Sequence, residues 1–150
     1  MKYEKIWEKI LSKDEKVEFE FSIGKKYLKL GLIVSAIYSI PLLFLAGLGV
    51  LTFLIGLFVY GFYLNKANAY AFTNKRVLIH KGWLSTNVVS IDYQKITDVH
   101  VSEPFFDRIF TKTGNIGINT AGTSNLETIL RHIESPYEIK KKLDELKDNH

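Results

Sequence analysis

Four histidines have the side chains best suited to acid–base or metal chemistry: His80, His100, His132 and His150. Their spacing fits no metal motif such as H-x-x-x-H, and the chain has no cysteine to complete a zinc site. Asp98 and His100 share one face of a predicted strand, which permits an acid–base pair. A solvent-facing polar side explains the same pattern, and we favour it. We expect no metal and no cofactor.

Other catalytic motifs are absent or incomplete. No G-x-S-x-G sequence provides a nucleophile elbow. Residues Thr113–Gly117 are glycine-rich, but they lack the spacing and the lysine of a phosphate-binding loop, and they predict a hairpin turn instead. We therefore expect a protein that is not an enzyme.

The candidates for binding chemistry are basic and aromatic residues near predicted strand ends: Lys75, Arg76, Lys81, Phe105, Phe106 and Arg108. The basic residues are scattered, which predicts weak, salt-sensitive contact with anionic lipid headgroups and no specific lipid. The two phenylalanines either pack in the core, which we favour, or meet a partner or the lipid interface. The net charge of +4 is spread along the chain, so we expect no nucleic-acid partner.

The element that positions these residues is an uncharged run at residues 30–64. One helix of that length would measure ~52 Å, whereas the hydrocarbon core of a bilayer measures ~30 Å. Ala46-Gly47-Leu48-Gly49 lies in the middle and predicts a turn. We therefore expect a transmembrane hairpin with legs at Tyr27–Leu45 and Val50–Leu64. The turn has no polar residue, so a re-entrant hairpin stays open as a variant.

Lysines flank the run on both sides, and the turn has no charge. The positive-inside rule then places both termini in the cytoplasm, and the chain becomes a multi-pass protein of the cell membrane. The absence of cysteine fits a reducing compartment.

Small residues recur along both predicted legs and would permit close helix contact: Gly31, Ser35, Ser39, Gly49, Thr52 and Gly56. They serve either to pack the two legs together or to form an oligomer. The run has no acidic or basic residue to mark an ion path, so we expect no transport mechanism inside the hairpin.

Residues 65–150 alternate apolar and polar side chains in short stretches separated by turn residues, which predicts antiparallel strands. Ser135-Pro136-Tyr137-Glu138 then predicts the start of a C-terminal helix. Residues 1–29 combine a short amphipathic helix with an alternating strand. We expect Lys16–Ile23 to pair with the sheet of the β domain; the competing outcome places Phe19 and Phe21 in the lipid interface.

Five short motifs carry a family resemblance: Ala71–Leu78, Val89–Ile91, Ile96–Val99, Arg108–Phe110 and Thr113–Ile116. Their order after the apolar hairpin resembles bacterial pleckstrin-homology-like (PH-like) domains of the membrane-flanked type. The resemblance implies an antiparallel β roll or barrel capped by a helix, without catalytic residues. It also implies a lipid-binding position at Lys75 and Arg76, because basic residues of the first hairpin loop often bind phosphoinositides in eukaryotic PH domains.

The function expected from the sequence is a membrane-anchored binding or scaffolding module. Its β domain would face a protein or lipid-headgroup partner at the cytoplasmic membrane surface. A second copy of the chain is the other partner to consider. The alternative function is an accessory subunit whose transmembrane hairpin packs into a larger transport or export complex.

Overall fold

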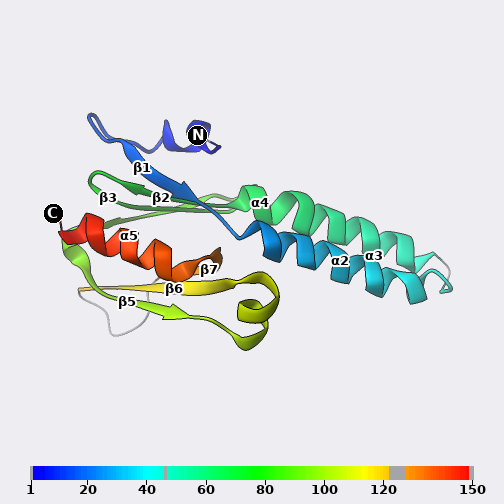
Figure 1. The fold of residues 1–150 in the computed structure, drawn as a ribbon. Coiled ribbons are helices and arrows are strands. Elements are labelled where there is room, and N and C mark those ends of the chain that lie inside the picture. The colour runs from blue at the N-terminus through cyan, green and yellow to red at the C-terminus, as the bar shows by residue number, and fades with distance from the viewer. Residues whose placement is uncertain (1, 46, 122–127, 149–150) are drawn as a thin grey trace.

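The computed structural model describes residues 2–45, 47–121 and 128–148. Figure 1 shows a β-sandwich from which a helical hairpin projects. The strands form two antiparallel sheets, with the orders β1-β2-β3-β4 and β5-β6-β7. Helix α5 (Pro136–Asp148) packs against the second sheet and contributes Ile139 and Leu143 to the core.

The first sheet contains β1 (Val17–Phe21), β2 (Asn68–Thr73), β3 (Arg76–Lys81) and β4 (Asn87–Asp92). Because side chains alternate across a strand, this sheet presents two apolar faces. The inner face meets the second sheet through Tyr70, Phe72, Val77, Ile79 and Ile91, all of them buried.

The second sheet contains β5 (Ile96–Ser102), β6 (Thr113–Thr120) and β7 (Thr128–Glu134). The 3-10 turn η2 (Tyr93–Lys95) leads into β5, and the π-helical turn η3 (Asp107–Thr111) lies between β5 and β6. Ile116, Ile118, Leu130 and Ile133 of this sheet are 0–1% exposed and complete the core. The sequence predicts a strand at Asn125–Ile133; its first residues lie outside the described ranges, and β7 covers the remainder.

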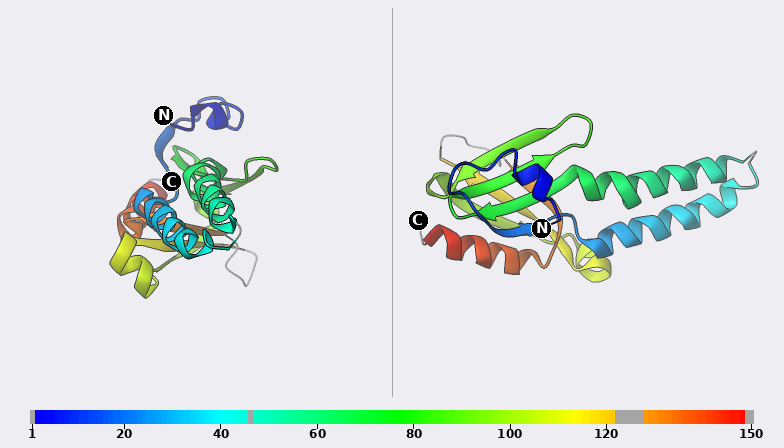
Figure 2. Two further views of the ribbon diagram at one scale, coloured as in Figure 1. Left: turned by 90° about the vertical axis from the view of Figure 1, so that its right-hand side faces the viewer. Right: turned by 90° about the horizontal axis from the view of Figure 1, so that it is seen from above.

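The N-terminal residues are part of the sandwich. Strand β1 pairs antiparallel with β2, with Phe21 opposite Tyr70, and both phenylalanines of β1 pack against the core. Helix α1 (Glu4–Trp7) lies over the outer face of the same sheet, where Tyr3 and Trp7 join Leu78 in a second buried cluster. Figure 2 shows α1 above the strands near the base of the hairpin.

The hairpin consists of α2 (Lys25–Leu42) and a second leg built from α3 (Leu48–Gly56), the π-helix η1 (Leu57–Tyr63) and α4 (Leu64–Ala67). Gly47 directly precedes α3 and has φ +78°, a left-handed conformation that glycine adopts without strain. Pro41 lies in the last turn of α2, where a helix interrupted by proline readily ends.

The small residues of the hairpin lie between its legs. A side chain at Gly31 would collide with Tyr60, and one at Gly56 would collide with Ser35. Farther out, the Thr52 hydroxyl donates to Ser39 Oγ at 3.2 Å. These contacts let the two helices approach closely, as small residues do at other helix–helix contacts.

Two predictions from the sequence are wrong: the transmembrane character of the hairpin, and the resulting placement as a multi-pass protein of the cell membrane with both termini cytoplasmic. Within the described ranges, only the second leg, Leu48–Ala67, is long and apolar enough to cross a membrane. The first leg begins with lysines at positions 25, 26 and 29. Its uncharged part rises only about 20 Å, which is less than the ~30 Å hydrocarbon core.

Close packing between the legs leads to the first prediction. Gly56→Ala should lower the free energy of unfolding by about 1–3 kcal/mol, because the added methyl group must push the Ser35 side of α2 away. Thermal and chemical unfolding, followed by circular dichroism in a neutral detergent, measures this change.

Gly61→Ala is the matched control, because a Cβ at Gly61 meets nothing within 4 Å. Alanine favours helix over glycine by ~1 kcal/mol, so this variant should be as stable as the parent or slightly more stable. Equal destabilisation by both variants would contradict close packing at Gly56.

Candidate functional site

The six predicted binding residues divide between the two ends of the sandwich. Lys75 and Arg76 follow β2 at the end far from the hairpin (Figure 1). Lys81 pairs with Asn68, the first residue after the hairpin, so it lies at the near end. Phe105, Phe106 and Arg108 lie in or beside η3, which packs against α2. One partner surface therefore does not include all six.

At the far end, Arg76 is bound within the chain. Its guanidinium group donates to both carboxylate oxygens of Glu15 at 2.9 Å and to Ser90 Oγ at 2.8 Å. The side chain of Glu15 is fully buried, and the side chain of Arg76 is 22% exposed. An anion at this turn would have to displace Glu15 from the guanidinium group.

Burial opposes ionisation of Glu15, but hydrogen bonds from Arg76, from the Ser12 backbone and from Thr73 outweigh that effect. Together they lower the pKa of Glu15 to about 2. A bidentate contact of this kind between a guanidinium group and a carboxylate is among the stronger polar contacts in proteins.

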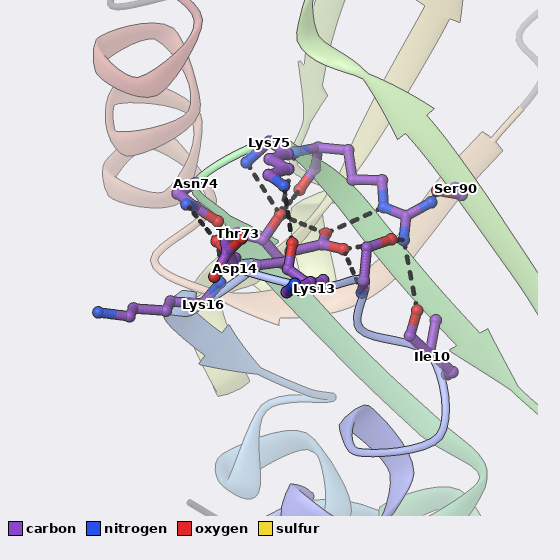
Figure 3. A network of polar contacts seen from close by, with 11 residues as sticks. Ile10, Lys13, Asp14, Lys16, Thr73, Asn74, Lys75 and Ser90 are labelled. Carbon is purple, nitrogen blue, oxygen red and sulfur yellow. Dashed lines mark hydrogen bonds and ion pairs between the residues drawn. The ribbon is translucent and has the colours of Figure 1, made fainter.

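The same network holds the whole segment before β1 (Figure 3). Asn74 accepts from the Lys16 backbone N–H at 2.8 Å and donates to the Asp14 carbonyl at 3.2 Å. The Lys75 ammonium group donates to the Lys13 carbonyl at 3.0 Å. The observed contacts of Lys75 and Arg76 are therefore structural, and their role in headgroup binding stays a prediction.

At the near end, aromatic contacts fix two loops to the hairpin. Trp83, in the turn between β3 and β4, meets Phe62 edge-to-face with ring centroids 5.0 Å apart. Tyr27 of α2 stacks on His132 at 3.7 Å. The His132 Nδ1 lies 3.1 Å from the Asp107 carboxylate, which ties η3 to the same site.

Large apolar side chains on these loops stay exposed beside the hairpin. Phe105 and Phe106 are 69% and 71% exposed, so the favoured core position for them is wrong. Phe110 is 62% exposed, and Leu84 beside Trp83 is 88% exposed. The three phenylalanines contact one another in series, with ring centroids 5.6 Å and 6.3 Å apart, whereas Leu84 lies on the separate turn between β3 and β4.

Sequence reasoning missed the Trp83–Leu84 turn. Its signal was an apolar pair directly after Gly82. Gly82 adopts φ +102°, and a side chain there would collide with the backbone of Ser85. Apolar residues in the turn of a β-hairpin cannot reach the core that the two strands form. The type and position of Trp83 and Leu84 therefore already indicate a contact outside the sandwich.

The residues considered for catalysis do not form a buried site. His100 Nε2 lies 2.8 Å from Asp98 Oδ2, but both side chains are more than half exposed. Within residues 2–45, 47–121 and 128–148, no group of three or more metal-ligating side chains comes together.

Comparison with known proteins identifies the fold. The family model described as "Bacterial PH domain" matches residues 28–147. The chain therefore belongs to the bacterial PH domain family. That description names no membrane, so the membrane-flanked qualifier stays a prediction. No curated protein matches the chain.

Two crystal structures share the fold. A protein with a pleckstrin-homology domain from Shewanella loihica is 12% identical, with a TM-score of 0.53, over 97% of this chain and 94% of that one. A pleckstrin-homology domain from Shewanella amazonensis is 11% identical, with a TM-score of 0.54, over 97% of this chain and 96% of that one.

The similarity covers nearly the whole chain, hairpin included. This extent corrects the predicted architecture: the chain is a PH-like β-sandwich with a C-terminal helix, and not a β domain attached to a separate transmembrane unit. PH domains are in general binding modules rather than enzymes, so the protein is a binding or scaffolding module by fold class.

The Glu15–Arg76 contact leads to the second prediction. Glu15→Gln should lower the free energy of unfolding by about 2–3 kcal/mol at neutral pH. The pKa of Glu15 is lower in the folded chain (about 2) than its ordinary value of 4.5, so the stabilisation is complete above that ordinary value. It disappears as the pH falls through the folded value, and the difference between parent and variant should shrink accordingly.

Urea unfolding at neutral pH and at about pH 3 tests this expectation. Glu134→Gln is the control, because its carboxylate meets the exposed Lys26 at 3.6 Å, and such surface pairs contribute ~0–1 kcal/mol. A difference for Glu15→Gln that does not change with pH would contradict the proposed role of its ionised form.

Proposed function

We propose that the protein is a PH-type binding module that attaches to a lipid surface from one side, with its hairpin dipping into the bilayer without crossing it. The observation that carries the proposal is the outer surface of the hairpin, which is apolar and exposed along both legs. The sandwich would then rest against the headgroup layer and hold its near-end loops there.

The exposed side chains form broad bands. On α2, Ile33, Val34, Ile37 and Tyr38 are 41–70% exposed. The second leg repeats this i, i+1, i+4, i+5 pattern with Val50, Leu51, Leu54 and Ile55, which are 54–56% exposed. A soluble amphipathic helix has one apolar stripe facing its core, whereas these wide arcs are exposed and join neither of the two buried clusters found among the described residues.

A lipid phase fits such a surface better than one folded partner does. A partner protein covers one side of a hairpin, but the apolar arcs point outward from both legs and continue over the tip at Phe44, which is 89% exposed. Lipid chains can surround all of these sides at once. Burial of each large apolar side chain is worth roughly 1.5–3 kcal/mol.

The length and the tip of the hairpin support partial insertion. The second leg is long enough to cross a bilayer, but the uncharged part of the first leg reaches only about 20 Å, which is short of the ~30 Å hydrocarbon core. Several N–H groups at the tip find carbonyl partners within the turn, including Leu45 to Leu42 at 3.1 Å and Leu48 to Leu45 at 3.0 Å. Backbone groups satisfied in this way enter lipid at lower cost.

The base of the hairpin has the residues that an interface favours. Trp83 and Tyr63 are 42% and 37% exposed there, and aromatic side chains with a polar end prefer the headgroup level. Lys25, Lys29 and Lys66 are exposed beside them and would add weak attraction to anionic headgroups. Lys75 and Arg76 lie at the opposite end of the sandwich and are not part of this surface.

The rival function is an accessory subunit that packs its helical hairpin into a larger complex. It needs a face of small residues on the hairpin that is free to contact a helix of another protein. The small residues that would provide one, Gly31, Ser35 and Gly56, already lie between the two legs.

The third prediction tests insertion. The chain has no cysteine, so one cysteine can be placed at the tip as Leu45→Cys and one on α5 as Lys141→Cys. In lipid nanodiscs, both faces of the bilayer are open to a water-soluble maleimide. We expect Lys141→Cys to react freely and Leu45→Cys to react at least about tenfold more slowly, until detergent dissolves the disc.

Equal labelling of the two cysteines in intact nanodiscs would contradict the proposal, because the tip would then lie in water. Circular dichroism of both variants checks that each has folded.

A further inference from the structure

A groove of about 820 Å³ lies between the N-terminal residues, α4 and the turn that joins β3 to β4. It lies on the outer face of the first sheet, beside the base of the hairpin. None of the predicted binding residues lines it, and its volume falls within the range of small-molecule sites.

The wall of the groove is apolar. Tyr3, Ile6 and Ile10 line it from the N-terminal side, and Trp83 and Val88 line it from the sheet side. Trp83 also contacts Phe62 of the hairpin, so the apolar wall continues toward the hairpin base. This wall fits a hydrocarbon chain.

The groove also has an excess of positive charge. Four lysines line it, Lys2, Lys5, Lys9 and Lys66, against the single carboxylate of Glu4. Asn65 accepts from the Lys2 ammonium group, and the Lys66 ammonium group lies over the Phe62 ring. Lys5 and Lys9 are exposed, and their ammonium groups have no carboxylate within 4.0 Å among the described residues.

One buried polar side chain in the groove lacks a partner. His80 lines the groove and is 7% exposed, and its Nδ1 has no hydrogen-bond partner among the described residues. His80 lies opposite Ala69 and Val88 in the sheet, on the face that α1 covers. A buried polar atom without a partner is costly, and a ligand oxygen in the groove would supply one to the imidazole.

Burial lowers the pKa of His80, so the imidazole is neutral near pH 7. A neutral imidazole has one N–H donor and one acceptor. The positive charge for an anion therefore comes from the lysines, and His80 contributes hydrogen bonding from the sheet.

We propose that this groove binds an anionic amphiphile. A phosphate or carboxylate head would lie among Lys5, Lys9 and His80, and a hydrocarbon chain would lie along Ile6, Val88 and Trp83. The site does not depend on insertion of the hairpin, because a soluble amphiphile reaches it from water.

Native mass spectrometry of the full chain, released from a neutral detergent, tests the proposal. The probes are dioctanoyl-phosphatidylglycerol, dioctanoyl-phosphatidylcholine, decanoate and glycerol 3-phosphate. We expect the phosphatidylglycerol to bind at least about tenfold more tightly than the phosphatidylcholine, which has the same chains but no net charge. Glycerol 3-phosphate, which has no chain, should bind far more weakly than either anionic amphiphile.

The two anionic amphiphiles distinguish the source of the ligand. Tighter binding of the phosphatidylglycerol assigns the groove to a membrane phospholipid, whereas tighter binding of decanoate assigns it to a free fatty acid. Equal binding of phosphatidylglycerol and phosphatidylcholine would overturn the proposal, as would glycerol 3-phosphate binding as tightly as the amphiphiles.

Charge-reversal variants locate the site. The double variant Lys5→Glu, Lys9→Glu should lose at least about tenfold in affinity for phosphatidylglycerol. The matched control is Lys13→Glu with Lys141→Glu, which changes the net charge equally at exposed positions outside the groove. An equal loss in the control would mean diffuse attraction by the whole chain and would overturn the proposal.

His80→Phe separates binding from folding. It keeps the ring and removes the unpartnered nitrogen, so the variant should be at least as stable as the parent while binding phosphatidylglycerol several-fold more weakly. If a folded His80→Phe variant binds phosphatidylglycerol with unchanged affinity, the proposed contact between His80 and the ligand head is wrong. These variants lie outside the hairpin, so we expect them to leave the labelling of Leu45→Cys unchanged. A failed groove prediction can then be told apart from a failed prediction of hairpin insertion.

Discussion

The pairing of β1 with β2 closes the long connection that runs through α2, α3, η1 and α4. These strands are neighbours in the sheet, with Phe21 opposite Tyr70, although the whole hairpin separates them in the chain. Their pairing forces the hairpin to leave and re-enter the sandwich at the same end. At this point the chain also bridges to the second sheet, where Ile23 pairs with Ile133 and the Gly24 N–H donates to the His132 carbonyl at 2.8 Å.

The base of the hairpin is therefore held by backbone and side chains together. Two sheets, η3 and the Trp83 turn all contact it, and a side chain at Gly24 would collide with Thr113. Because the base is fixed, the orientation of the exposed loops relative to the legs is fixed too. Phe105, Phe106 and Leu84 are exposed on or beside the loops that contact this base.

The far end of the sandwich has a different role. There, Glu15 and Arg76 attach the segment before β1 to the β2–β3 turn. This attachment, with Trp7 buried on the outer face and its indole N–H donating to Glu20 at 3.1 Å, keeps α1 over the sheet. The groove exists only because α1 stays there. A polar contact at one end of the domain thus shapes a binding surface near the other.

The sequence by itself determined the local elements and the family. A short apolar run that ends at Gly82 predicts β3 at Arg76–Lys81, and the Ser-Pro start predicts α5 at Pro136–Asp148, because such local signals act on the backbone directly. It also located the apolar hairpin, but hydropathy alone does not say whether such a hairpin crosses a membrane. Tertiary structure decided which residues meet. It turned Arg76 inward to Glu15 and left Phe105 and Phe106 outside the core. It also brought Lys5 and Lys9 into the same groove as His80. Residues about 70 positions apart share a groove only after α1 packs on the sheet, and no local pattern records that contact.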